Sequence, residues 1–113
     1  MSFLHTAQQF RDGVKTVTRR LGWRNLKTGD QFIAVVRARG VRKEQIERLG
    51  ICQVLCARQE PLDAIDELDV IREGCPNMTP EEFIEMFCRI NRQKKCQPDT
   101  VVTRIEFKRI EGS

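Results

Sequence analysis

The fold is decided by residues 13–20, which read Gly-Val-Lys-Thr-Val-Thr-Arg-Arg, and by residues 26–36, which read Leu-Lys-Thr-Gly-Asp-Gln-Phe-Ile-Ala-Val-Val. Residues 15–21 combine β-branched Thr and Val with polar residues, a composition typical of a β-strand. Gly22 and the Gly29–Asp30 step are turn signals. Residues 31–38 form the clearest buried strand of the chain. Two strands joined by turns are therefore expected to begin the sheet.

The elements around these strands indicate the fold class. A short helix is expected over residues 6–13, and strands over residues 51–58 and 101–110. Between them, residues 61–72 predict a helix, and Thr-Pro-Glu-Glu from Thr79 predicts the start of another. Residues 39–50 are expected to be a charged connection. Strands at both ends with helices between them favour an α+β fold, closed as a small, mostly antiparallel β-barrel with flanking helices.

The length of the chain and its pattern of apolar residues limit the classes of protein to which it can belong. A chain of 113 residues is expected to form one domain over residues 1–113. No apolar run approaches the roughly 20 residues that cross a bilayer. The N-terminus has no basic start followed by an apolar stretch, so it does not predict a signal peptide. We therefore expect a cytoplasmic protein with no membrane segment.

The cysteines do not predict a disulfide framework or a metal site. Their number, five, is odd and their spacing is irregular. On a strand, Cys52 and Cys56 would lie about 13 Å apart, too far for a disulfide or one shared ion. His5 is the only histidine, so no zinc site and no cofactor are predicted. The cysteines are interpreted as buried or half-buried free thiols.

Charge is distributed unevenly along the chain. Residues 1–50 carry 11 Lys or Arg against 4 Asp or Glu, whereas residues 51–113 carry 9 against 12. Arg19, Arg20, Arg24 and Lys27 form the densest basic cluster, and we predict that they contact phosphates. Trp23 beside them would either stack on a base or fill the core. The expected partner is RNA, a nucleoside or a nucleotide, and a protein partner stays undefined.

These basic and turn residues resemble the signature of the ASCH family. Its members carry Gly-x-Lys-Thr-x-Thr-x-Arg after a short helix, followed by a Gly-Asp turn that leads into a strand. Arg72-Glu73-Gly74 looks like the family's Glu-Gly step before its last helix, and the strand around residues 105–107 is similar to its closing strand. ASCH domains are similar in fold to PUA domains, small β-barrels that bind RNA. The resemblance implies a PUA-like barrel that binds RNA or a nucleoside in a basic cleft around Lys15.

The resemblance also implies an alternative function, hydrolysis. A bacterial branch of the family converts N4-acetylcytidine to cytidine with a lysine, a threonine and a glutamate, which fall on Lys15, Thr18 and Glu73. This chain would then be a metal-independent amidohydrolase or a ribonuclease. It departs from that branch at Arg19, where the branch has an apolar residue, and in the longer basic connection over residues 37–48.

Elementary chemistry is compatible with both functions. A lysine whose pKa is lowered by burial or a nearby cation can act as base or nucleophile. Thr18 could donate to an oxyanion, and Glu73 could orient water. Lys15 could equally bind a phosphate or lie in solvent, so binding and catalysis stay open. If the three residues form one site, Glu73 should lie within salt-bridge reach of Lys15 or within hydrogen-bond reach of Thr18.

Overall fold

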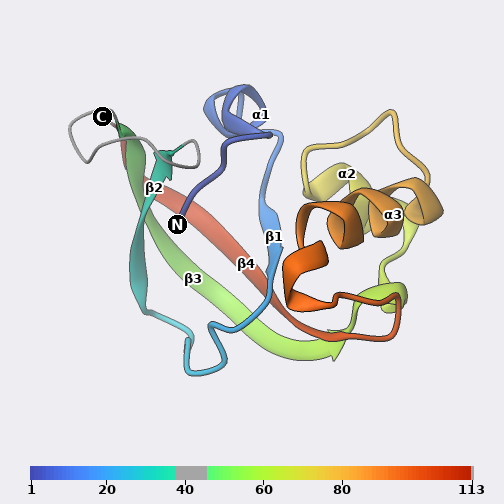
Figure 1. Ribbon diagram of the computed structural model, residues 1–113. Helices are drawn as coiled ribbons and strands as arrows, with labels where there is room; N and C mark the ends of the chain where they lie inside the picture. The colour runs from blue at the N-terminus through green and yellow to red at the C-terminus, as the bar shows by residue number, and fades with distance from the viewer. Residues whose placement is uncertain (38–45, 113) are drawn as a thin grey trace.

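The computed structural model describes residues 1–37 and 46–112, and its strands form one antiparallel sheet. In chain order the elements are α1 (Ala7–Arg11), β1 (Val17–Arg20), β2 (Gln31–Val36), β3 (Glu47–Pro61), η2 (Leu62–Ala64), α2 (Glu67–Arg72), α3 (Pro80–Ile90), η3 (Arg92–Lys94) and β4 (Val101–Gly112). The strand order across the sheet is β1-β4-β3-β2. The predicted α+β class, with short helices beside a mostly antiparallel sheet, is confirmed (Figure 1).

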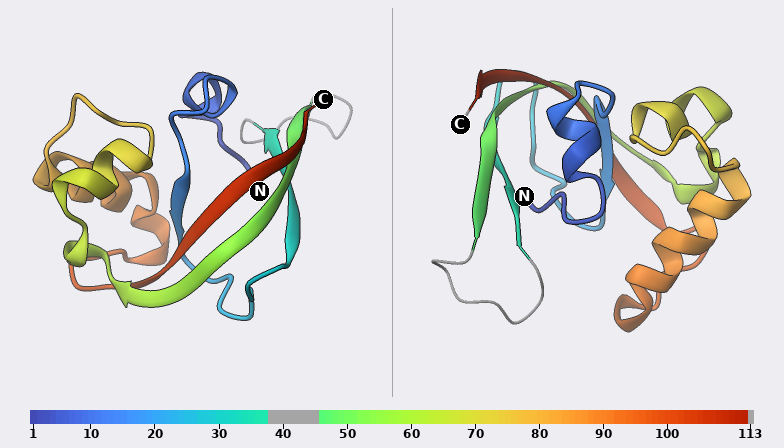
Figure 2. Two further views of the ribbon diagram at one scale, coloured as in Figure 1. Left: turned by 180° about the vertical axis from the view of Figure 1, so that it is seen from behind. Right: turned by 90° about the horizontal axis from the view of Figure 1, so that it is seen from above.

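The sheet curls into a half-barrel because its two long strands bend. β3 and β4 pair from Gly50 opposite Gly112 to Pro61 opposite Val101, with register shifts at Ile51/Cys52 and at Val54/Cys56. Such bulges bend a strand and increase its twist. In the left view of Figure 2, which is seen from behind, β3 and β4 arch together in front of β1 and the N-terminal segment, with α2 and α3 gathered on one side.

Two clusters of buried side chains fill the molecule. The first lies inside the curl and is rich in phenylalanine: Phe3, Phe10, Phe32 and Phe107 pack with ring centroids 5.4 to 6.3 Å apart. The second packs α2, α3 and η2 against the end of the sheet, through Leu62, Ile65, Val70, Phe83, Phe87 and Val102. β1 lies between the N-terminal segment and the helices (Figure 1).

The helix expected over residues 61–72 is wrong in its first half. β3 continues to Pro61, residues 62–64 form a 3₁₀ turn, and α2 begins only after Asp66, whose side chain accepts from the Asp69 amide. Leu62 and Ile65 are buried, whereas Leu68 and Ile71, which continue the same spacing, are 60% and 45% exposed. The helical spacing of these apolar residues therefore runs across two separate elements, η2 and α2, and does not correspond to one face of a single helix.

The end of the expected connection also differs from the prediction. Residues 47–50, expected in the connection, belong to β3, whereas residues 39–45 of the connection and residue 38 of the strand expected before it lie outside the described residues. The helix predicted from Thr79 is present, with its capping box formed as expected. Within residues 1–37 and 46–112, none of the helices has the length and apolar character needed to cross a membrane.

Candidate functional site

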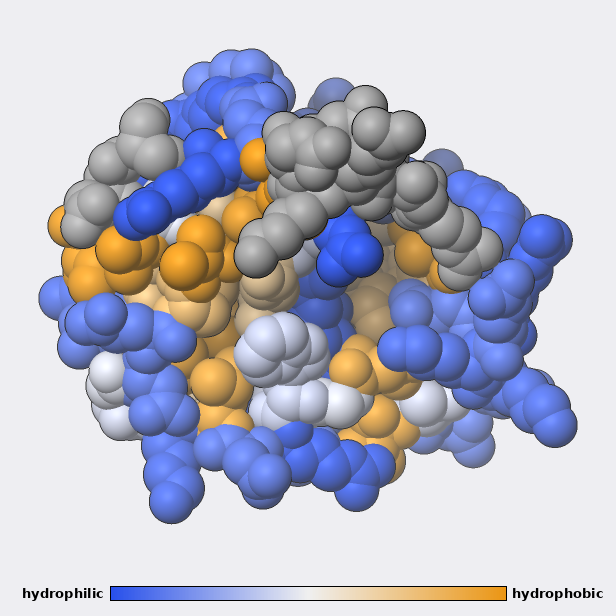
Figure 3. Space-filling model, turned by 60° about the vertical axis from the view of Figure 1, so that its left-hand side comes forward, coloured by the Kyte–Doolittle hydropathy of each residue, from blue (hydrophilic) through white to orange (hydrophobic). Residues whose placement is uncertain are grey.

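A cavity of about 780 Å³ lies between the N-terminal segment, β1 and α3. Residues 2–6 line one side, Lys15 and residues 18–21 line the base, and residues from α3 and η3 line the opposite side. Figure 3 shows a hollow on this face of the molecule, with hydrophilic residues in its depth and hydrophobic residues beside it. The predicted residues Lys15, Thr18 and Glu73 all line this cavity.

Lys15 and Glu73 form a buried ion pair at the base of the cavity. Their side chains are 4% and 5% exposed, and Lys15 Nζ donates to Glu73 Oε1 at 3.0 Å. The same Nζ donates to the Glu73 carbonyl oxygen at 2.9 Å and lies 5.2 Å from the centroid of the Phe3 ring. A shared site required Glu73 to lie within salt-bridge reach of Lys15, and the structure places it there.

Gly74 explains how the two residues come so close. It follows α2 with a φ of +92°, the left-handed conformation common after a helix C-terminus. A Cβ at this position would lie 2.9 Å from Gln9 Cβ and 3.3 Å from Lys15 Cβ. Only a residue without a side chain lets the end of α2 approach α1 and Lys15 at this distance. The Glu-Gly step is therefore a structural requirement of the pair.

Arg19 lies beside this pair, in a network of buried ion pairs. Its Nη2 donates to Asp69 Oδ2 at 2.5 Å and to Glu60 Oε2 at 2.9 Å, while Nη1 donates to Glu73 Oε2 at 3.4 Å. Arg104 Nε and Nη2 donate to the two Asp69 oxygens at 2.7 and 3.0 Å. Arg19 was predicted to contact phosphate, but its side chain is 1% exposed and is paired with three carboxylates.

The network also shifts the ionisation of its members. Hydrogen bonds from Arg104, and then from Arg19 and Arg72, hold the pKa of Asp69 far below its ordinary value despite burial. The Asp69 bonds in turn raise the pKa of Arg104 above its ordinary value. Arg19 joins this network to Glu73, because it contacts one carboxylate oxygen of Glu73 while Lys15 contacts the other. Asp69 and Arg104 were not predicted as site residues, and only their burial in three dimensions identifies them.

Thr18 and Arg20 extend the base of the cavity. Thr18 is buried on β1 and its Oγ1 accepts from Arg20 Nε at 3.2 Å. Arg20 also donates to the Ser2 carbonyl, and its guanidinium lies 5.2 Å from the Phe3 centroid. Burial lowers the pKa of Arg20, while the Glu73 charge acts in the opposite direction. Lys15 precedes β1, so strand alternation does not separate it from Thr18.

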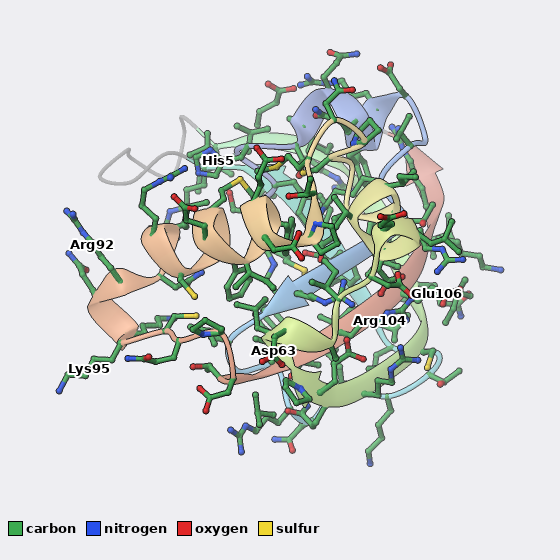
Figure 4. All side chains as sticks on the ribbon, turned by 90° about the vertical axis from the view of Figure 1, so that its right-hand side faces the viewer. His5, Asp63, Arg92, Lys95, Arg104 and Glu106 are labelled. Atoms are coloured by element: carbon green, nitrogen blue, oxygen red, sulfur yellow. The ribbon has the colours of Figure 1, made fainter. Side chains whose placement is uncertain are left out.

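The exposed residues of the cavity lining include four cations beside the apolar Leu4, Trp23 and Ile90. We call Arg37, Arg89, Arg92 and Lys94 the cationic rim, because each lines the cavity and none is buried. Arg92 projects outward beyond the end of α3 (Figure 4). Among the described lining residues, Glu73 is the single carboxylate. Sequence reasoning missed the rim because three of its four members lie in the half of the chain with more acids than bases.

The remaining predicted residues divide into two groups. Trp23 is 46% exposed and lines the cavity, so it does not fill the core. Its turn is fixed by Thr103, whose hydroxyl donates to the Gly22 carbonyl. Arg24 and Lys27 are exposed but are not among the residues that line the cavity. The structure thus brings together Lys15, Thr18, Arg20, Trp23 and Glu73, and leaves Arg24 and Lys27 apart from them.

Residues 1–37 and 46–112 contain no group of three or more His, Cys, Asp or Glu side chains placed to hold a metal ion. The five cysteines are free, with Cys52 buried and the others half-buried. Burial raises the pKa of Cys52 to about 11.

The comparisons with known proteins identify the fold. No family model matches the sequence, and no curated protein matches it. The crystal structure of protein EF3133 from Enterococcus faecalis V583, described as family-model DUF984, matches with a TM-score of 0.68 and 20% identity, over 94% of this chain and 67% of that one. An ASCH domain from Lactobacillus crispatus JV V101 matches with a TM-score of 0.66 and 15% identity, over 94% of this chain and 70% of that one. At these identities the likeness concerns the fold.

Proposed function

We propose that this chain, whose fold is that of the ASCH domain it matches, binds RNA or a nucleotide in the cavity at β1. One nucleoside unit occupies the cavity, and the cationic rim holds the flanking phosphates. The observation that carries this proposal is the composition of the lining. Buried hydrogen-bonding groups lie at its base, an exposed tryptophan lies at its edge, and the four cations of the rim lie around it.

The base of the cavity has the groups that a nucleobase needs. An ammonium has three N–H donors, and Glu73 accepts two hydrogen bonds from Lys15 through its carboxylate and carbonyl oxygens. Glu73 offers acceptor oxygens, and the Thr18 hydroxyl can donate and accept. Trp23 supplies a flat apolar surface, and stacking of this kind contributes about 1–3 kcal/mol per base. Together these groups can form hydrogen bonds with the edge of a base and stack on its face.

The phosphate contacts are tested by the salt dependence of RNA affinity. Each phosphate neutralised on a single strand contributes about 0.7 to the slope of log affinity against log salt. Replacing both Arg92 and Lys94 with Gln should lower the affinity for a short single-stranded RNA and flatten this slope by about 1.4. Fluorescence anisotropy at a series of salt concentrations measures both quantities.

Arg24 and Lys27 provide the matched control. The variant Arg24→Gln/Lys27→Gln removes the same charge from exposed positions outside the cavity lining. Its slope should stay near that of the wild type. An equal loss of slope in the two double variants, or a wild-type affinity that salt does not change, would contradict the proposed contacts.

A second candidate function, hydrolysis of an acylated nucleoside, is favoured by the 3.0 Å contact between Lys15 and Glu73 in a cavity that Thr18 also lines. In N4-acetylcytidine, water would add to the acetyl carbon while Glu73 accepts its proton and Thr18 donates to the developing oxyanion. The C–N bond then breaks, the proton passes to N4, and acetate and cytidine leave.

This activity is tested by incubating the protein with N4-acetylcytidine and separating the products by chromatography. Lys15→Met and Glu73→Gln should each abolish cytidine release, and the double variant should be little worse than either single one. Incubation with a short RNA under the same conditions tests for ribonuclease products. If nucleosides bind and no product forms in either incubation, the hydrolase function is excluded and the binding function stands.

A further inference from the structure

Cys88 and Cys96 lie next to each other at the end of α3. Their sulfur atoms are 3.5 Å apart, and both residues are half-buried against the second core cluster. The chain reverses between them. The Asn91 amide and side chain both donate to the Phe87 carbonyl, and Lys95 adopts a left-handed φ of +56°. The sequence did not reveal this pair, because a separation of eight residues brings two side chains together only when such a turn closes.

We propose that a peroxide or a small disulfide oxidant joins Cys88 and Cys96 in a reversible disulfide bond. A disulfide has an S–S distance of about 2.04 Å, so the sulfurs must approach by about 1.5 Å from their present separation. Side-chain rotation accommodates a movement of this size at the end of a helix. The pair is thus a modification site separate from the base of the cavity.

The reaction balances with peroxide as the oxidant. One cysteine thiolate attacks a peroxide oxygen, forming a sulfenic acid and releasing hydroxide, which takes up a proton to become water. The second thiol then attacks the sulfenic sulfur, the S–S bond forms, and a second water leaves with the thiol proton. Two thiols are oxidised by two electrons, and one peroxide is reduced to two waters.

The bond would enclose the segment that bears three of the four cations of the cationic rim. Arg89, Arg92 and Lys94 lie between the two cysteines and line the cavity. Closing a short loop restricts the conformations open to it, so oxidation should hold Arg92 and Lys94, which follow the end of α3, in place. Burial, and then the Cys88 sulfur, raises the pKa of Cys96 to about 11. Little Cys96 thiolate is therefore present at neutral pH, and the reaction should quicken as the pH rises.

Mass spectrometry tests the bond directly. Trypsin places Cys88 in the peptide of residues 73–89, which also holds Cys75, and Cys96 in the peptide of residues 96–104. We therefore use the Cys75→Ser variant, treat it with hydrogen peroxide, block the remaining thiols and digest. A linked peptide pair should appear, lighter than the two free peptides by two hydrogen atoms, and dithiothreitol should separate it. The further change Cys88→Ser should abolish it.

Limited proteolysis tests the restriction of the turn without any nucleic acid. Arg89, Arg92, Lys94 and Lys95 are trypsin sites inside the loop, and native oxidised protein should be cut there several-fold more slowly than native reduced protein. In the Cys88→Ser variant, peroxide should leave the cutting rate unchanged. Failure to detect the linked pair would overturn the disulfide. A linked pair with an unchanged cutting rate would overturn its action on the rim turn. Neither result depends on RNA binding.

Discussion

At the residue scale, Glu73 forms ion pairs with two cations at once. Its two carboxylate oxygens contact Lys15 Nζ at 3.0 Å and Arg19 Nη1 at 3.4 Å, all in buried surroundings. Removing one partner of a buried pair leaves the other charge uncompensated, at a cost of about 3–5 kcal/mol. The two partners are not equivalent, because Glu73 keeps Arg19 when Lys15 is removed, whereas both cations lose this carboxylate when Glu73 is neutralised.

We therefore expect Glu73→Gln to lower the free energy of unfolding by about 3–5 kcal/mol, and Lys15→Met to lower it by less. Urea denaturation followed by circular dichroism measures both. Glu85→Gln, an exposed position on α3, is the matched control and should change stability by less than about 0.5 kcal/mol. An equal or larger loss for Lys15→Met would show that Arg19 does not support Glu73.

The residues of this site differ in how far sequence could reveal them. Lys15, Thr18 and Glu73 were found through a motif resemblance, and the structure brings them to one cavity. The role of Arg19 could not be predicted in the same way. Its three carboxylate partners lie 41, 50 and 54 residues away along the chain, so no local pattern distinguishes this buried arginine from the exposed cations that follow it.

At the element scale, the junction after α2 depends on Gly74. Alanine there would carry a backbone cost of about 1–2 kcal/mol for a left-handed φ and would press on Gln9 and Lys15. Gly29 has a similar φ of +95°, but a Cβ added there would meet no atom of the described residues within 4 Å. Gly74→Ala should therefore lower the free energy of unfolding more than Gly29→Ala does. The expected difference is about 1–3 kcal/mol, the usual cost of overpacking.

The difference between the two free energies of unfolding isolates the steric contact from the backbone cost. Gly74→Ala should also weaken any ligand bound near Lys15, because the added methyl group displaces the Lys15 stem. Equal losses of stability in the two alanine variants would mean that the close approach of Gly74 to α1 does not contribute to the cost of the Gly74→Ala substitution.

The helices show why some elements could be predicted and others could not. The start of α3 is encoded locally, since Thr79 and Glu82 satisfy each other's backbone amides. The start of α2 is not encoded locally. Leu62 lies in a 3₁₀ turn and Ile65 has an extended backbone, yet both are buried and their spacing matches that of a helix. Similarly, η3 contributes Arg92 and Lys94 to the rim only because the chain turns after Ile90.

At the scale of the whole molecule, the buried carboxylates make stability depend on pH. The pKa of Asp69 is lower in the folded protein than its ordinary value, through Arg104, Arg19 and Arg72. For Glu60, burial favours a higher pKa, but the hydrogen bonds from Arg58 and Arg19 lower it overall. Groups with lowered pKa values stabilise the fold above their unfolded pKa values, and this contribution is lost as the pH falls through the folded values.

The free energy of unfolding should accordingly decline below about pH 4, near the ordinary pKa values of Asp and Glu. Asp69→Asn should be less stable than the wild type at neutral pH, with a shallower decline in acid. Urea denaturation at a series of pH values provides both curves. Parallel declines in the two proteins would show that Asp69 does not govern acid unfolding.

The position of β4 also determines when the sheet can form during synthesis. β4 is the last strand in sequence, yet it lies between β1 and β3 and supplies every ladder partner of β1, from Val17 opposite Glu106 to Arg20 opposite Thr103. While residues 101–106 are still inside the ribosome, Thr18 and Arg19 have no strand beside them. The hairpin of β2 and β3 can pair earlier, so the base of the cavity is assembled only after β4 emerges.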